Sequence, residues 1–363
     1  MRKPFRFIIK SVKSPVKKLK LLIKDWAGWL GIPKIVIFRG YANEDKAVVM
    51  GTVLEDKGLT KPNQKDSIFK NMLGMIKRYA SDELPFAEVE VTFQGQKKLV
   101  TAGENGIFRT VFDIKPNHER QKWVTVEAKL VNDMGQGEKT ITAKGEVLYV
   151  DQKAEFAIIS DIDDTVLVSY STSFMKKMRL MLMKNAATRS PFEGVTEFYQ
   201  ALKSGITPGL NPLFFISSSE WNLYDLLEDF ADYNNIPKAV FLLRELEVSM
   251  FKFWKSGGGS HDHKIRKITK LLEFYNNTKF ILIGDSGQQD PELYLQIIKK
   301  HPERILYVYI RDLSVRKRKR LQEIKKECEA LGVQMLALKT THDAWLHAVD
   351  KKLITAEEYS AAN

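Results

Sequence analysis

Short, continuously apolar runs alternate with helical stretches after residue 150, and this pattern constrains the fold more than any other feature of the sequence. The runs predict strands at residues 155–160, 212–217, 238–243, 279–284, 305–310 and 333–338. Such runs suit strands that are buried on both faces, and helices between them indicate a parallel sheet covered on both sides. We therefore expect residues 151–350 to form an α/β domain that binds its ligand beyond the carboxyl ends of the strands.

The segment 34–150 has a different pattern, in which apolar and polar residues alternate in short runs separated by polar turns. Strands are predicted at residues 34–41, 47–54, 87–93, 106–112, 123–130 and 139–149, with one helix at about 66–80. Strands at this spacing favour a mainly antiparallel, β-sandwich-like domain. No catalytic cluster stands out in this segment, so a binding or positioning role and a plain structural role both remain open.

The first segment, residues 1–33, is strongly basic, because nine Lys and Arg residues precede the first acid, Asp25. A helix is predicted at 14–30, where Ser14 can cap and Pro15 suits the first helical position. Its apolar residues recur at spacings of three and four, whereas its lysines fall largely elsewhere on the helix. A basic amphipathic helix of this kind can lie on a membrane surface. It can equally pack its apolar stripe on the next domain and leave its lysines in solvent.

Composition limits the classes of protein to consider. The chain has 363 residues, 44% hydrophobic and 28% charged, which is ordinary for a globular protein and disfavours wholesale disorder. A single cysteine, Cys328, excludes an internal disulfide framework and a Cys-rich zinc site, and it favours a reducing, cytoplasmic setting. No apolar run approaches the ~18 residues that a membrane span needs. The formal net charge of +12 points to an anionic partner, such as a phosphorylated substrate, a phospholipid surface or a nucleic acid.

Acidic side chains follow the first predicted strand of the α/β domain, in the segment Ser160-Asp161-Ile162-Asp163-Asp164-Thr165. Carboxylates this close repel one another unless a cation lies among them. Alternation places Asp161 and Asp163 on one side of the chain, which suits a nucleophile beside a general acid/base. A carboxylate can attack a phosphoryl group to form an aspartyl-phosphate, and a second can protonate the leaving oxygen and then activate water.

Two later strand ends add further candidates. Ser217, Ser218 and Ser219 follow the second strand, where hydroxyls and backbone amides can hold phosphate oxygens. The fourth strand runs into Gly284 and two acids, Asp285 and Asp290. Oxygen ligands without His or Cys favour Mg²⁺. Lys264, in the helix that leads into this strand, can neutralise charge on a phosphoryl group.

These motifs, in this chain order, resemble the haloacid dehalogenase superfamily of phosphatases. More narrowly, residues 160–169 (SDIDDTVLVS), 215–224 (FISSSEWNLY), the His263-Lys264 pair and residues 282–294 (LIGDSGQQDPELY) are similar to the actin-patch-type phosphatidate phosphatase family of yeast and bacteria. One departure is Glu220, which stands where that family is expected to have Pro.

The resemblance implies a Rossmann-like parallel sheet and a role for each matching residue. Asp161 would be the nucleophile and Asp163 the acid/base, and both would be Mg²⁺ ligands together with Asp285 and Asp290. The remaining residues would act around this pair. Thr165 would be a supporting residue, Ser217 and Ser218 would bind phosphate, Lys264 would stabilise charge, and Asp285 would bind the metal with the help of Asp290.

An insertion at about 169–192 follows the nucleophile motif, where superfamily members carry a cap that shapes substrate access. It is rich in Met and contains Lys176, Lys177 and Arg179, which suit an acyl chain with a phosphate head and are predicted to bind substrate. An ordinary amphipathic helix packed on the domain would show the same pattern. The basic run at 316–320 could likewise contact a phosphate-bearing surface or be a solvated helix face.

The sequence therefore predicts a Mg²⁺-dependent phosphatase for a lipid phosphomonoester, with phosphatidate converted to diacylglycerol. Its expected partner is an anionic membrane, so that a cytoplasmic protein could bind peripherally to the inner face. Nucleic acid is not expected, because the basic runs lack regularly interleaved aromatic residues. The alternatives are a phosphatase for nucleic-acid ends or phosphoproteins, and a membrane-binding adaptor with a regulatory phosphatase domain.

Overall fold

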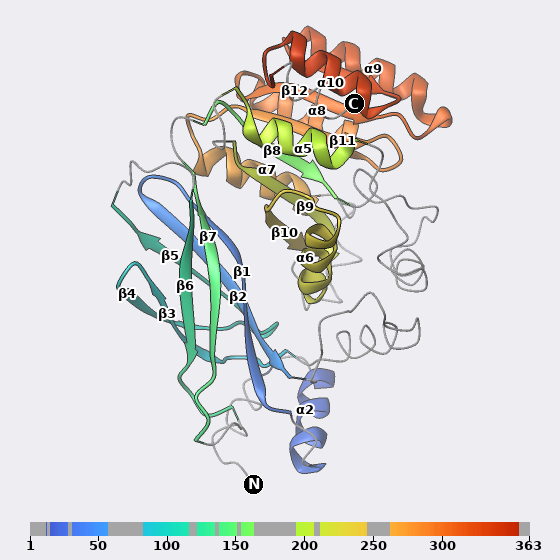
Figure 1. The fold of residues 1–363 in the computed structure, drawn as a ribbon. Helices are drawn as coiled ribbons and strands as arrows, with labels where there is room; N and C mark the ends of the chain where they lie inside the picture. The colour runs from blue at the N-terminus through green and yellow to red at the C-terminus, as the bar shows by residue number, and fades with distance from the viewer. Residues whose placement is uncertain are drawn as a thin grey trace.

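The structure is a computed structural model that describes residues 12, 15–27, 31–56, 83–115, 122–134, 138–150, 154–162, 194–206, 211–244 and 262–355. Its strands form two sheets (Figure 1). The first, sheet A, contains β1 (Pro33–Ala42), β2 (Lys46–Glu55), β3 (Glu88–Phe93), β4 (Gln96–Thr101), β5 (Ile107–Asp113), β6 (Lys122–Leu130) and β7 (Thr142–Tyr149). The second, sheet B, contains β8 (Ala157–Asp161), β9 (Leu213–Glu220), β10 (Val240–Arg244), β11 (Phe280–Asp285), β12 (Ile305–Arg311) and β13 (Gln334–Leu338).

The described helices are α2 (Pro15–Ala27), α5 (Val195–Ser204), α6 (Tyr224–Tyr233), α7 (Asp262–Phe274), α8 (Asp290–Lys300), α9 (Arg318–Ala330) and α10 (Thr341–Asp350). Three short 3₁₀ turns accompany them, η2 (Trp221–Leu223), η4 (Pro302–Arg304) and η5 (Val315–Lys317). Within these residues no helix is long and apolar enough to cross a membrane.

Sheet B is parallel throughout, as the continuous apolar runs predict, and the α/β class of this half is confirmed. The strand order is β10-β9-β8-β11-β12-β13. One face packs against α5, α6 and α10, and the other against α7, α8 and α9, so the strands are buried on both sides. This order reverses between β8 and β11, and a crevice forms at the carboxyl ends of the strands at such a reversal.

Sheet A has the order β4-β3-β6-β7-β1-β2-β5. All neighbouring strands in it are antiparallel except β7 and β1, which pair in parallel over Gly40–Ala42. The edge strands β4 and β5 approach each other, since the side chain of Gln96 donates to the carbonyl of Asp113 at 2.8 Å. The sheet therefore curls around one apolar core instead of lying flat.

Strand β4 is absent from the sequence prediction, and its composition explains the omission. The strand is QKKLVT, and its residues are exposed or only partly buried, so it has no run of core residues. It is joined to β3 by a tight turn at Gln94 and Gly95, which both have positive φ (46° and 78°). A two-residue turn of this kind matches the twist of a β-hairpin.

The two sheets pack against each other through β1. Phe38 stacks on Trp221 of η2 with ring centroids 4.2 Å apart, and it also contacts Tyr224 of α6. The guanidinium of Arg39 lies 3.0 Å from the carboxylate of Glu228. On the other face of sheet B, the Tyr275 hydroxyl donates to the carbonyl of Ala42 at 3.3 Å. The β-rich half thus completes both apolar cores of the α/β half.

Helix α2 is held on the β-rich half by one face. Leu21 is buried, and the ammonium of Lys24 lies 2.9 Å from the buried carboxylate of Glu55. The opposite face carries exposed apolar side chains, namely those of Leu19, Leu22, Ile23 and Trp26. At 100° per residue these four positions share one stripe, which points away from the anchoring face. In Figure 1, α2 lies at the end of the β-rich half that is remote from sheet B.

Candidate active site

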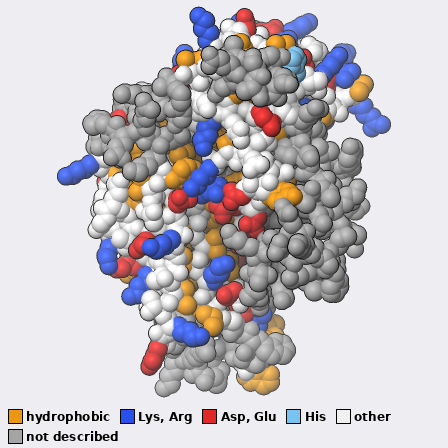
Figure 2. Space-filling view, in the orientation of Figure 1, with side chains coloured by type: hydrophobic (Ala, Val, Ile, Leu, Met, Phe, Trp, Pro, Cys, Tyr) orange, Lys and Arg blue, Asp and Glu red, His pale blue; other side chains and the backbone are white. Residues whose placement is uncertain are grey.

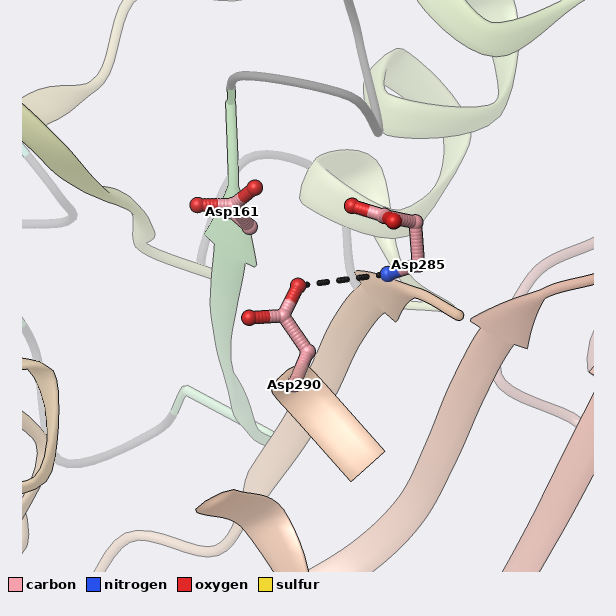
Figure 3. Close-up of side chains that lie close together, drawn as sticks. All are labelled: Asp161, Asp285 and Asp290. Carbon is pink, nitrogen blue, oxygen red and sulfur yellow. Dashed lines mark hydrogen bonds between the residues drawn. The ribbon is translucent and has the colours of Figure 1, made fainter. Parts of the chain in front are cut away.

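Three buried carboxyl groups meet at the point where the strand order of sheet B reverses. Asp161 is the last residue of β8, Asp285 the last of β11, and Asp290 the first of α8. One oxygen from each lies within 4.8 Å of the others, and all three side chains are buried. Figure 3 shows the carboxyl groups of Asp161 and Asp285 directed into the same space, with Asp290 below them. The structure therefore brings together three of the four predicted metal ligands.

Lys264 of α7 is the fourth buried charged group of this cluster. Its ammonium lies 2.7 Å from Oδ1 of Asp161 and 3.0 Å from Oδ1 of Asp290. One ammonium cannot balance three carboxylates in a buried site, where like charges are costly. The cluster consists of hard oxygen donors with no His or Cys among its described members, so a divalent cation such as Mg²⁺ fits the remaining charge.

The turn after β11 sets the positions of the two later acids. Oδ2 of Asp290 accepts the backbone N–H of Asp285 at 3.2 Å, the hydrogen bond drawn in Figure 3. Oδ1 of Asp285 accepts the N–H groups of Gly287 and Gln288 at 2.6 and 2.9 Å. A Cβ added at Gly284 would lie 2.7 Å from Oδ2 of Asp290, so only glycine lets this carboxyl approach the strand. Both of Asp290's oxygens thus accept protein hydrogen bonds, which fix this carboxyl group next to Asp285.

Gln288 is a site residue that the sequence reasoning missed. Its side-chain amide donates to Oδ2 of Asp161 at 3.3 Å, while Lys264 donates to Oδ1 of the same carboxylate. Two donors from different elements therefore fix the orientation of the Asp161 carboxylate. Its position in the sequence could have identified it, since Gln288 lies between Asp285 and Asp290 in the loop at a strand end.

The segment that follows β12 holds this loop from outside. The hydroxyl of Ser286 accepts the backbone N–H groups of Leu313 and Ser314 at 2.8 and 3.1 Å. The ammonium of Lys317 donates to the carbonyls of Gly287 and Gln288 at 2.9 and 2.7 Å. The loop with Asp285 and the basic run are consequently parts of one hydrogen-bonded unit.

Arg311, at the end of β12, adds a positive charge next to the site. Burial lowers the pKa of Arg311 to about 10, and the neighbouring Asp285 carboxylate opposes that shift. Behind the nucleophile candidate, the hydroxyls of Ser160 and Tyr199 lie 2.6 Å apart. Burial raises the pKa of Tyr199, which keeps this hydroxyl neutral. The surroundings of the acids are therefore neutral or cationic.

The predicted phosphate-binding serines lie at the end of β9. Ser217 is buried, and its hydroxyl accepts the backbone N–H of Ser219 at 2.9 Å. The Ser218 hydroxyl oxygen is buried without a hydrogen-bond partner among the described residues. Glu220, the departure from the family pattern, lies 3.1 Å from the guanidinium of Arg244 on the neighbouring strand β10.

Several predicted residues fall outside the described part of the chain. They are Asp163, Thr165, Lys176, Lys177 and Arg179, together with the insertion at 169–192 and the predicted helix at 66–80. Their assignments remain predictions.

Comparison with known proteins identifies the domain that carries these acids. Residues 156–312 match the family model described as phosphatidate phosphatase APP1, catalytic domain. The chain is 29% identical to phosphatidate phosphatase APP1 of Saccharomyces cerevisiae over 157 residues, 43% of this chain and 26% of the yeast protein. It is 25% identical over 250 residues to an uncharacterized protein of Schizosaccharomyces pombe, covering 66% of this chain and 40% of that protein. The chain thus spans less than half the length of either relative.

Among solved structures, a carbohydrate acetylesterase from Xanthomonas citri aligns with 85% of this chain and 69% of its own, at 11% identity and a TM-score of 0.33. A β-glucuronidase from Parabacteroides merdae aligns with 77% and 33%, at 9% identity and a TM-score of 0.26. TM-scores of this size do not establish a shared fold. The family match instead agrees with the motifs in the sequence, and it spans Asp161, Lys264, Asp285 and Asp290. Residues 156–312 are therefore similar to the catalytic domain of phosphatidate phosphatase APP1.

Proposed function

We propose that the chain is a Mg²⁺-dependent phosphatase that hydrolyses the phosphomonoester of a lipid, with phosphatidate as substrate and diacylglycerol as product. The observation that carries the proposal is the buried cluster of Asp161, Lys264, Asp285 and Asp290. It lies at the carboxyl ends of β8 and β11, within the segment that matches the phosphatidate phosphatase family. The name of the yeast relative supports the choice of substrate.

In the proposed reaction, an oxygen of the Asp161 carboxylate attacks the phosphorus atom and the bond to the lipid oxygen breaks. Asp163 donates a proton to that oxygen, so diacylglycerol leaves and an aspartyl-phosphate remains. Asp163 then takes a proton from water, whose oxygen attacks the phosphorus atom. The bond between phosphorus and the Asp161 oxygen breaks, so inorganic phosphate leaves and the Asp161 carboxylate is restored. A bound Mg²⁺ would neutralise charge on the phosphoryl oxygens, with Asp161, Asp163, Asp285 and Asp290 as its ligands.

Other residues of the chain would hold the phosphoryl group in line for this attack. Lys264 already donates to Asp161, so its ammonium can also stabilise negative charge that develops next to that carboxylate. The Ser218 hydroxyl has no partner within the described residues and can donate to a phosphoryl oxygen, beside Ser217 on the same strand. Gln288 would keep the attacking carboxylate oriented through its contact with Oδ2.

The lipid substrate implies that the protein works at a membrane surface. We infer peripheral attachment to an anionic, cytoplasm-facing surface, with Lys176, Lys177 and Arg179 of the insertion near the lipid headgroup. The basic N-terminal segment and the exposed apolar stripe of α2 support this location.

Phosphate release with and without Mg²⁺ tests this function on phosphatidate, lysophosphatidate, phosphopeptides and 3′-phosphorylated oligonucleotides. We expect release from phosphatidate only when Mg²⁺ is present, and its removal with a chelator should stop the reaction. Asp161→Asn and Asp163→Asn should abolish turnover and leave the circular dichroism spectrum unchanged. Asp350→Asn, at the exposed end of α10, is the matched control. Faster release from oligonucleotides or phosphopeptides, or ready turnover by either active-site variant, would contradict the proposal.

A further inference from the structure

A basic segment with exposed apolar side chains lies directly beside the candidate active site. It comprises residues 313–320, which we call the rim segment. These residues span η5, the start of α9 and the turn that leads from β12. Because β12 is a strand of the parallel sheet B, this turn lies at the same edge of the sheet as Asp161 and Asp285.

Hydrogen bonds fix the rim segment to the acidic loop. Leu313 and Ser314 donate their backbone N–H groups to the hydroxyl of Ser286, the residue that follows Asp285. Lys317 donates to two carbonyls of the same loop. A surface that the rim segment contacts would therefore be close to the site of the proposed reaction.

The side chains of the rim segment combine two chemistries. Val315 is 72% exposed and Leu313 45% exposed, although both are apolar. The run Arg316-Lys317-Arg318-Lys319-Arg320 follows, and all of it except the partly buried Lys317 is exposed. In Figure 2, Lys and Arg side chains gather with hydrophobic ones at the upper right, where α9 lies in Figure 1. Single exposed apolar residues are ordinary, but exposed apolar residues beside a basic run form a surface suited to lipid.

The placement of these bases is unfavourable for the helix itself. The positive end of the helix macrodipole is at the N-terminus, where acids stabilise and bases destabilise. Helix α9 has no acid in its first turn, and five bases precede or occupy that turn. Asp312 pairs with Arg318 at 2.6 Å, which offsets one of them. Bases at a helix N-terminus are unfavourable, so their presence beside the candidate active site indicates that their positive charge has a function.

We propose that the rim segment docks the active-site edge of the protein on an anionic lipid bilayer. Leu313 and Val315 enter the interfacial layer, and Arg316 and Lys319 contact anionic headgroups. This inference rests on the proposed function, because it names the surface that presents the lipid substrate. The attraction of bases to an anionic surface supplies affinity, and the adjacent acidic, cation-holding site receives the phosphorylated headgroup.

An environment-sensitive fluorophore attached to Val315→Cys tests the location directly. Labelling should be selective, because the native cysteine, Cys328, is buried. The matched control carries the probe at Leu99→Cys on β4, a position that is 62% exposed and lies in sheet A. With phosphatidylcholine vesicles that contain phosphatidate or phosphatidylserine, we expect a blue shift of the emission for the probe at 315 and none at 99. No shift at 315, or equal shifts at both positions, would overturn the proposal.

A charge variant tests the role of the bases. Each base near an anionic surface strengthens binding by about fivefold, so loss of two lowers the vesicle affinity about 25-fold, and reversal lowers it further. We expect this loss for Arg316→Glu combined with Lys319→Glu. The control pair, Lys270→Glu with Lys300→Glu, makes the same charge change at exposed positions further along α7 and α8. Equal losses for both pairs would mean that only the net charge matters, against the proposal.

Hydrolysis assays separate a failure of docking from a failure of the proposed function. The rim variant should lose activity on phosphatidate in vesicles but keep wild-type activity on a short-chain phosphatidate dissolved below its micellar concentration. If the wild type hydrolyses neither substrate, the proposed function fails, whereas the probe still reports docking. If the wild type hydrolyses both substrates and the probe at 315 does not respond to vesicles, the proposed docking surface is wrong and the proposed function stands. A response of that probe to oligonucleotides but not to vesicles would replace the bilayer with nucleic acid.

Discussion

Phe38→Ala tests whether the β-rich half is a structural part of the active site. Phe38 is buried in sheet A's strand β1 and packs against Trp221 and Tyr224 at ring-centroid distances of 4.2 and 4.8 Å. Truncation of a buried Phe to Ala costs about 3–5 kcal/mol, and loss of the aromatic pairs adds about 0.5–1.5 kcal/mol to that range. We expect the free energy of unfolding in urea to fall by about 4 kcal/mol.

The same change should also impair catalysis, because Trp221 directly follows the strand that carries Ser217 and Ser218. Without Phe38 the position of this strand end is less well fixed, so we expect a higher KM for phosphatidate in a temperature range where the variant remains folded. Phe93→Ala is the matched control: Phe93 is equally buried, but it lies in the core of sheet A. It should lose similar stability and keep its KM. A loss below about 1 kcal/mol for Phe38→Ala, or the same KM change in both variants, would refute the reasoning.

Three further outcomes are expected. In metal-free buffer, Lys264→Met leaves Asp161 and Asp290 without their shared cation and should lower the free energy of unfolding by about 3–5 kcal/mol, measured in urea. Added Mg²⁺ should restore part of this free energy. An unchanged free energy of unfolding would argue against the buried ion pairs. Burial raises the pKa of Cys328 to about 11, so the folded state keeps a proton that the unfolded state loses from about pH 9. The free energy of unfolding should therefore fall by about 2 kcal/mol as the pH rises to 11. Cys328→Ala should lack this dependence on pH. Trp26 is 80% exposed, so Trp26→Ser should change the free energy of unfolding by less than about 0.5 kcal/mol and should weaken vesicle binding. A large loss of stability would instead favour a helix α2 that packs its apolar stripe on the protein.

The sheet B strands were predictable because each is a continuous apolar run. Every predicted strand of this sheet overlaps an observed one, with boundaries that differ by a few residues. Sheet A was predictable only where one face is buried. Its edge strand β4 is largely exposed, so it carries no hydrophobic pattern, and the parallel pairing of β1 with β7 depends on the return path of the chain. Neither property is visible in local periodicity.

The acids of the candidate site were predictable for a topological reason. Asp161 and Asp285 were assigned because parallel strands bring their carboxyl ends to one edge. Lys264, which is 103 residues from Asp161 in the sequence, was assigned from its place in the helix that leads into the fourth strand and from the family resemblance. Gln288 and Lys317 were missed because their roles depend on contacts between loops. An amide and a surface lysine have no distinctive pattern in sequence, and only the folded chain shows that they reach Asp161 and the loop carbonyls.

The net charge of +12 acquires a spatial meaning at this edge of sheet B. Negative charge is gathered inside, where Asp161, Asp285 and Asp290 are buried together, and positive charge lies outside along the rim segment. Lys317 connects the two, since its ammonium holds the carbonyls of the loop that carries Asp285 while its neighbours face solvent. A uniformly basic surface would attract any polyanion, but a basic segment beside a buried acidic cluster would attract an anion and would then require a cation to admit it. Under the proposed function, that combination would select a phosphate group together with a divalent metal, which neither the total charge nor the acidic cluster alone would do.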